Sequence, residues 1–76
     1  MHAHHLHFKL KLRQFLMRHR DHRSYRTQVL GNFRLTPMKL FEEVVSACVA
    51  EGTITISPGP HGGEILTWNE AAVREV

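Results

Sequence analysis

The chain has 76 residues and a formal net charge of +3 at neutral pH, counting its seven histidines as neutral. A domain of this size buries only about 60% of its unfolded surface, which excludes a large enclosed substrate cavity. No apolar run reaches the roughly 18 residues that span a bilayer, and charges from Lys9 onward interrupt any signal-peptide core, so we expect a cytoplasmic protein with no membrane partner.

The charge is divided unevenly along the chain. Residues 1–39 carry nine Lys and Arg against Asp21 alone, whereas residues 40–76 carry Arg74 against six Glu. A basic half of this kind can meet phosphate groups, or it can meet the acidic half of a second copy of the chain.

Residues 1–7 contain four histidines, and neutral imidazoles bind Ni²⁺ or Zn²⁺. A native zinc site normally takes ligands from separate elements and orients them through further hydrogen bonds, and this tract offers neither. We therefore interpret residues 1–7 as a tag-like or disordered segment, and we predict no metal site and no cofactor.

Two periodicities overlap in the next segment. Residues 6–13 alternate apolar and polar side chains, as a strand does. Phe8, Leu12 and Leu16 also share one face of a helical wheel, and the residue types favour a helix. We expect a first helix over residues 8–20, and a strand over the alternating segment is the other interpretation.

The helical interpretation leaves a second apolar stripe, formed by Leu6, Leu10 and Met17, away from the core face. A solvated helix does not need such a stripe. We therefore predict a homodimer whose interface contains these three residues. If residues 6–13 form a strand instead, the same side chains can pair across a two-fold axis.

A short second helix is expected over residues 24–32. Ser24 is a suitable N-cap, and Val29 and Leu30 point inward. Gly31 and Asn32 both tolerate a positive φ, so they predict a turn at the end of this helix.

The third helix, over residues 37–51, has the clearest boundaries. Thr36 suits the N-cap, Pro37 the first helical position and Gly52 the left-handed position after the last turn. Cys48 is the only cysteine and falls on the buried stripe, where a free thiol behaves as a small hydrophobe.

A β-hairpin is predicted to follow the third helix. Residues 53–57 alternate with β-branched side chains, and residues 64–68 supply the partner strand. The Pro- and Gly-rich loop 58–63 has little to pack and is expected to be exposed, and residues 69–76 are expected to form a C-terminal tail. The predicted core comprises Leu12, Phe15, Leu16, Leu30, Leu40, Phe41, Val44, Val45, Cys48, Ile54, Ile56, Leu66 and Trp68.

No catalytic constellation stands out in the sequence. Cys48 is predicted to be buried, and four of the seven histidines lie in the N-terminal tract, so they suggest no nucleophile and base. The glycines of the hairpin loop precede no helix N-terminus that would cradle a phosphate. We predict that the chain is not an enzyme and has no small-molecule substrate.

Part of the chain resembles the winged helix-turn-helix family. The matching passages are the run from Leu35-Thr36-Pro37 through Ala50-Glu51-Gly52-Thr53-Ile54, and Trp68 at the end of the second strand. The resemblance covers residues 8–68. It implies an α+β fold, a small winged helix-turn-helix with three helices followed by a two-stranded antiparallel β-hairpin, the wing.

In that family the third helix usually enters the major groove and the wing touches the backbone or minor groove. The resemblance therefore implies a module that binds duplex DNA, such as a small transcriptional regulator or an accessory domain of a replication protein. The residues that it places at the nucleic acid are Ser24, Arg23, Arg26, Arg34, Thr36, Lys39 and His61.

The expected DNA-reading face differs from that of a strong DNA binder. It carries Lys39 against Glu42 and Glu43, and the wing tip has no Lys or Arg. Affinity for DNA comes largely from neutralising phosphates, which adjacent carboxylates repel. The alternative is a winged-helix module for protein interaction or dimerisation that does not bind DNA.

Overall fold

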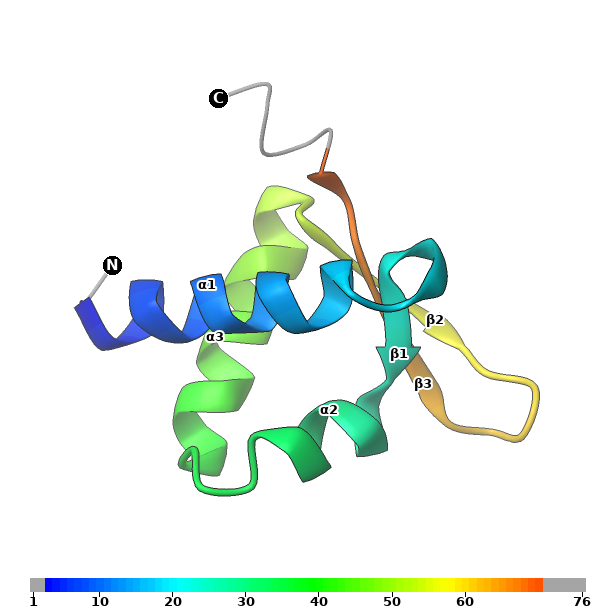
Figure 1. Ribbon diagram of the computed structural model, residues 1–76, viewed down its shortest axis with the longest axis horizontal. Coiled ribbons are helices and arrows are strands. Elements are labelled where there is room, and N and C mark those ends of the chain that lie inside the picture. The colour runs from blue at the N-terminus through cyan, green and yellow to red at the C-terminus, as the bar shows by residue number, and fades with distance from the viewer. Residues whose placement is uncertain (1–2, 71–76) are drawn as a thin grey trace.

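The computed structural model describes residues 3–70, and within them the chain forms an α+β domain, as predicted (Figure 1). In chain order the elements are α1 (Ala3–Met17), the 3₁₀ turn η1 (Arg20–His22), β1 (Arg23–Tyr25), α2 (Arg26–Asn32), α3 (Met38–Glu51), β2 (Ile54–Pro58) and β3 (Glu64–Trp68). This arrangement is compatible with a small winged helix-turn-helix, although it has three strands where two were predicted.

Residues 6–13 belong to the helix α1, so the helical periodicity predicts their structure correctly and the strand-like alternation does not. Phe8, Leu12 and Leu16 are buried along one face, because a helix brings residues four apart to the same side. The helix begins at Ala3 and not near residue 8, so the interpretation of residues 3–7 as disordered is wrong.

The first helix also ends earlier than predicted, at Met17 instead of residue 20. Asp21 and His22 adopt φ values of 59° and 56°, in the left-handed region where a right-handed helix cannot continue. The amide of His22 donates to the carbonyl of His19 at 3.0 Å, which closes the η1 turn and directs the chain into the sheet.

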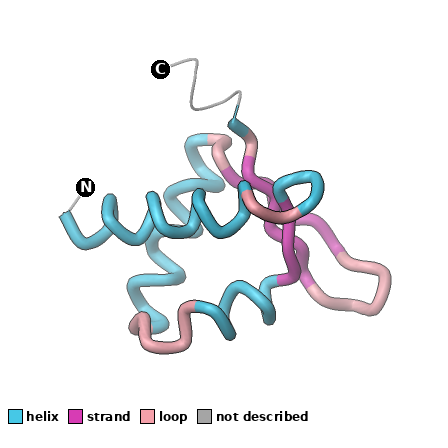
Figure 2. The backbone as a smooth tube through the Cα atoms, viewed as in Figure 1, coloured by secondary structure: helices cyan, strands magenta, loops and turns pink. Residues whose placement is uncertain are grey.

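The three strands form one antiparallel sheet with β3 in the centre, in the order β1-β3-β2. Figure 2 shows the strands gathered at one side of the helices. The predicted hairpin is confirmed as β2 and β3, but the third strand was missed because β1 is too short for an alternating pattern to reveal it. Its residues are extended through their pairing with β3, in which Ser24 lies opposite Leu66.

The boundaries of α2 and α3 agree only in part with the predicted capping residues. α2 begins at Arg26 and its N-cap is Tyr25, so the predicted start at Ser24 is wrong. α3 begins at Met38 with Pro37 as its N-cap, so the predictions of Thr36 as the N-cap and of Pro37 as the first helical residue are wrong, and the N-cap forms no side-chain capping bond. Its C-terminal end is as predicted, because Gly52 takes the left-handed conformation with φ 88°.

The core lies between α1, α3 and the inner face of the sheet. Its buried apolar residues are Phe8, Leu12, Leu16, Val29, Phe41, Val44, Val45, Cys48, Ile54, Leu66 and Trp68. Phe15, Leu30 and Leu40, which were predicted to be core, are partly buried and pack against this cluster. Ile56 was also predicted to be core, but it is 38% exposed because it lies on the edge strand β2 while Leu66 of the central strand takes the buried position.

Two residues after β3 belong to the packed domain. The Glu70 carboxylate accepts a hydrogen bond from Trp68 Nε1 at 2.7 Å and pairs with Arg13 of α1 at 2.6 Å. The rest of the predicted tail 69–76 lies outside the described residues. Within residues 3–70, no helix combines the length and the apolar character needed to cross a membrane.

Candidate nucleic-acid interface

The outward face of α3 is the surface that the sequence predicts to read DNA. Lys39, Glu43, Ser46 and Ala50 are exposed along it, and Glu42 is half-buried at its side. A face with one cation and two carboxylates is less unfavourable for phosphates when the carboxylates have positive partners. The structure gives Glu42 a guanidinium and Glu43 an imidazole as partners.

Arg26, at the start of α2, pairs with Glu42. Its guanidinium also lies 3.5 Å from the carboxylate of Glu64 on β3 and 5.6 Å from the centre of the Phe41 ring. Ion pairing and the ring contact hold the guanidinium against the protein. Arg26 was predicted to contact phosphate, but two carboxylates oppose its charge, and it instead reduces the repulsion that Glu42 exerts.

Glu43 has a partner on α1. Its carboxylate lies 3.3 Å from His5 Nε2, a contact that becomes an ion pair when the imidazole is protonated. The contact depends on the first turns of α1, which the sequence-based prediction did not treat as helix.

Most of the other predicted contact residues are exposed. Within residues 3–70, Arg34 and Lys39 have no carboxylate within ion-pair distance, and His61 is exposed at the wing tip. Arg23 lies 3.7 Å from Asp21, an exposed pair whose attraction in water is weak. Thr36 is half-buried just before α3.

Two predicted site residues are buried or partly buried. Ser24 is 5% exposed and its hydroxyl donates to Gln28 Oε1 at 2.8 Å, so it does not reach a phosphate. Met17, predicted at the dimer interface, is partly buried and packs against the core. Leu6 and Leu10 are each 51% exposed, as the predicted stripe requires.

Tyr25 positions the wing. The amide of Gly59 donates to the carbonyl of Gly63 and closes the loop, and a Cβ on Gly59 would come within 2.7 Å of Tyr25 Cε1. The wing loop is thus packed on the ring at the end of β1. The wing tip contributes shape and an imidazole, but no Lys or Arg.

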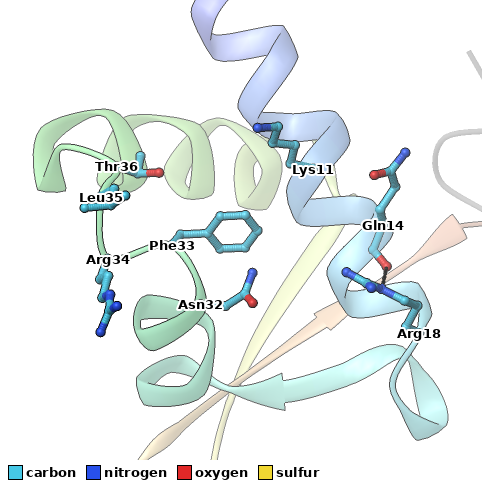
Figure 3. Close-up of a pocket in the computed structure, with 8 residues that line it drawn as sticks. All are labelled: Lys11, Gln14, Arg18, Asn32, Phe33, Arg34, Leu35 and Thr36. Carbon is cyan, nitrogen blue, oxygen red and sulfur yellow. Dashed lines mark hydrogen bonds between the residues drawn. The ribbon is translucent and has the colours of Figure 1, made fainter.

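A groove of about 470 Å³ lies between α1 and the turn that joins α2 to α3 (Figure 3). Its lining residues are Lys11, Gln14, Arg18, Asn32, Phe33, Arg34, Leu35 and Thr36. All three charged residues in it are cations. Sequence reasoning missed Lys11 and Arg18 as site residues, although their spacing from Gln14 places all three on one helix face.

The thiol and the described histidines are groups of the kind that metal-binding and nucleophilic sites use. Among residues 3–70, no group of three His, Cys, Asp or Glu is placed to hold a metal ion. Cys48 is buried, and desolvation raises the pKa of its thiol, although a hydrogen bond with Thr53 and the charge of Lys9 act in the opposite direction. A thiol with a raised pKa is protonated at neutral pH and is a poor nucleophile.

Three comparisons with known proteins give no relative. No protein-family model, curated protein or solved structure matches the chain. The function is therefore inferred from the placement and charge of the chain's own side chains.

Proposed function

We propose that this chain is a cytoplasmic winged-helix module that binds duplex DNA, as a small transcriptional regulator or an accessory domain of a replication protein. The observation that carries the proposal is the pairing of both carboxylates on α3, Glu42 with Arg26 and Glu43 with His5. Because Arg26 offsets the charge of Glu42, and a protonated His5 would offset that of Glu43, a phosphate that approaches Arg34 and Lys39 meets less repulsion than the sequence alone indicates.

The order of the elements supports the same proposal. α2, a short turn and α3 precede the β2–β3 hairpin, as in the family that the sequence resembles. In that arrangement α3 approaches the major groove, and the wing, with His61 at its tip, approaches the backbone. Lys39 stands in the first turn of α3 and would contact a phosphate at the edge of the groove.

Salt-dependent binding to a mixed-sequence DNA duplex tests the proposal. Each phosphate contact contributes about −0.9 to the slope of the logarithm of the binding constant against the logarithm of salt concentration. We expect binding at about 50 mM salt, and we expect Lys39→Gln to make the slope less negative by about one unit.

Arg20→Gln is the charge-matched control, since Arg20 is exposed on η1 and outside the proposed contacts. It should leave the slope unchanged. If the unmodified chain shows no binding to duplex DNA at about 50 mM salt, where weak electrostatic binding is strongest, the DNA proposal is abandoned.

Exposed leucines on α1 favour a second candidate function, a module for dimerisation or protein interaction. Leu6 and Leu10 lie one helical turn apart, and each is half exposed. Such a pair can pack against the same pair of a second copy across a two-fold axis. This candidate requires no affinity for DNA, and its test is the oligomeric state.

A further inference from the structure

The groove between α1 and the α2–α3 turn has two walls that are fixed relative to each other. One wall is formed by Lys11 and Gln14 of α1 and by Arg18 in the turn directly after this helix, and the other is the segment 32–36 (Figure 3). Phe33 lies between them, with its ring centre 5.1 Å from that of Phe8 and 5.7 Å from that of Phe15. These edge-on ring contacts tie the turn to α1, so the groove is preformed.

The groove concentrates positive charge that is not neutralised within the described part of the chain. Three other cations, Lys9, Arg13 and Arg26, each pair with a glutamate, whereas Lys11, Arg18 and Arg34 have no carboxylate of residues 3–70 within 4.0 Å. Among the same residues, no carboxylate lines the groove. This distribution favours an anionic ligand and disfavours a metal ion.

The polar groups in the groove suit a phosphate. The Nε of Arg18 donates to the backbone carbonyl of Gln14 at 3.3 Å, which orients the guanidinium and leaves its terminal nitrogens for two parallel bonds to phosphate oxygens. The side chains of Asn32 and Thr36 form no hydrogen bond within residues 3–70, so both keep a donor for further oxygens.

The rim of the groove adds an apolar contact. Leu35 is 94% exposed between Arg34 and Thr36, where its burial within the chain's own fold contributes almost nothing. A phosphate in a nucleic acid is flanked by sugars, and an exposed leucine beside cations can pack on a sugar. The groove is partly open to solvent, which leaves room for a ligand that continues beyond it.

We propose that this groove binds phosphate, with Lys11 and Arg18 on one wall and Arg34 at the rim of the other. The phosphate belongs to the backbone of duplex DNA. This part of the proposal rests on the proposed DNA-binding function. DNA then contacts the first helix as well as α3, and the basic first half of the chain contributes to affinity.

The first arm of the test measures salt-dependent binding of the full chain to a mixed-sequence duplex. We expect Lys11→Gln and Arg18→Gln each to make the slope less negative by about one unit, because each removes one phosphate contact. Arg20→Gln removes the same charge outside the groove and should not change the slope. Circular dichroism of each variant should match that of the unmodified chain, since Lys11 and Arg18 are exposed.

The second arm uses inorganic phosphate as the probe and backbone amide NMR shifts as the readout. Phosphate, compared with chloride of equal ionic strength, should shift the amides of segment 32–36 and of Lys11, and Arg18→Gln should abolish these shifts. This arm requires no DNA.

The two arms separate the possible results. If the groove variants change the salt slope of DNA binding, the groove binds phosphate and DNA supplies that phosphate. If phosphate shifts the amide signals but the chain does not bind DNA, the groove binds free phosphate and the proposed DNA function is wrong. If phosphate shifts the amide signals but the groove variants have the same salt slope of DNA binding as Arg20→Gln, the groove binds phosphate and DNA does not supply it. If the chain binds DNA, the groove variants leave the salt slope unchanged and phosphate shifts no amide signal, the groove proposal is wrong and the DNA function stands. If the chain neither binds DNA nor shows phosphate-induced shifts, both proposals are wrong.

Discussion

Arg26 changes the charge of the expected DNA-reading face through contacts with three residues. It pairs with Glu42, approaches Glu64 and lies over the ring of Phe41. The guanidinium thereby links α2, α3 and β3. The sequence predicts Arg26 as a free cation, because residues 26 and 42 are brought together only by the packing of α2 against α3.

Removing the Glu42 carboxylate should weaken the hold on this cation, which keeps its contact with Glu64. We expect Glu42→Gln to tighten binding to mixed-sequence duplex DNA and to make the salt slope more negative, because Arg26 gains freedom to contact a phosphate. Salt-titrated binding isotherms measure both quantities. Glu51→Gln removes an equal charge at the far end of α3, where Glu51 pairs with Lys9, and serves as the control. Weaker or unchanged binding by the Glu42 variant relative to this control would show that α3 does not face DNA.

At the scale of elements, the parts that the sequence predicts best are those with local signals. The end of α3 is set by Gly52. The alternating, β-branched pattern predicts a strand over residues 53–57, and β2 lies one residue further on, while its partner β3 lies over residues 64–68 as predicted. β1 has no such signal, because three residues cannot display a period and their extended form depends on β3. The start of α1 was missed because a run of histidines carries little helix preference of its own.

The wing should be sensitive to a single methyl group. Gly59→Ala would place Cβ 2.7 Å from Tyr25 Cε1 and 3.0 Å from the carbonyl oxygen of Gly63, so the loop must shift. We expect the free energy of unfolding to fall by about 1–3 kcal/mol, the usual cost of overpacking. Urea unfolding followed by circular dichroism gives this value.

Gly31→Ala is the matched control for the wing variant. Gly31 lies within α2 and a Cβ there meets no atom within 4 Å, so the same substitution should stabilise the chain by about 0.5–1 kcal/mol. Equal stability changes in the two variants would mean that the Tyr25 ring does not fix the wing loop.

At the scale of the whole molecule, the sequence predicts the uneven charge but not where the charge accumulates. The groove combines Lys11 of α1 and Arg18 just after it with Arg34 from the turn, and the Phe33 contacts with Phe8 and Phe15 hold the turn beside that helix. The spacing along α1 indicates that Lys11 and Arg18 share a face. It cannot indicate what that face meets, and the ion pairs that neutralise Lys9, Arg13 and Arg26 are also invisible in the sequence.

The exposed leucines of α1 predict how the chain assembles in solution. Leu6 and Leu10 are both 51% exposed on the outward face of α1, while Met17 packs inward, so any two-fold contact is centred on the first half of the helix. We expect the unmodified chain to be a dimer in light scattering at high micromolar concentration, and the double variant Leu6→Gln with Leu10→Gln to be a monomer, because it removes most of the apolar area that would be buried. Val49→Thr changes an exposed apolar residue on α3 and should leave the dimer intact. A monomeric unmodified chain, or a double variant that still dimerises, would show that α1 does not form the interface.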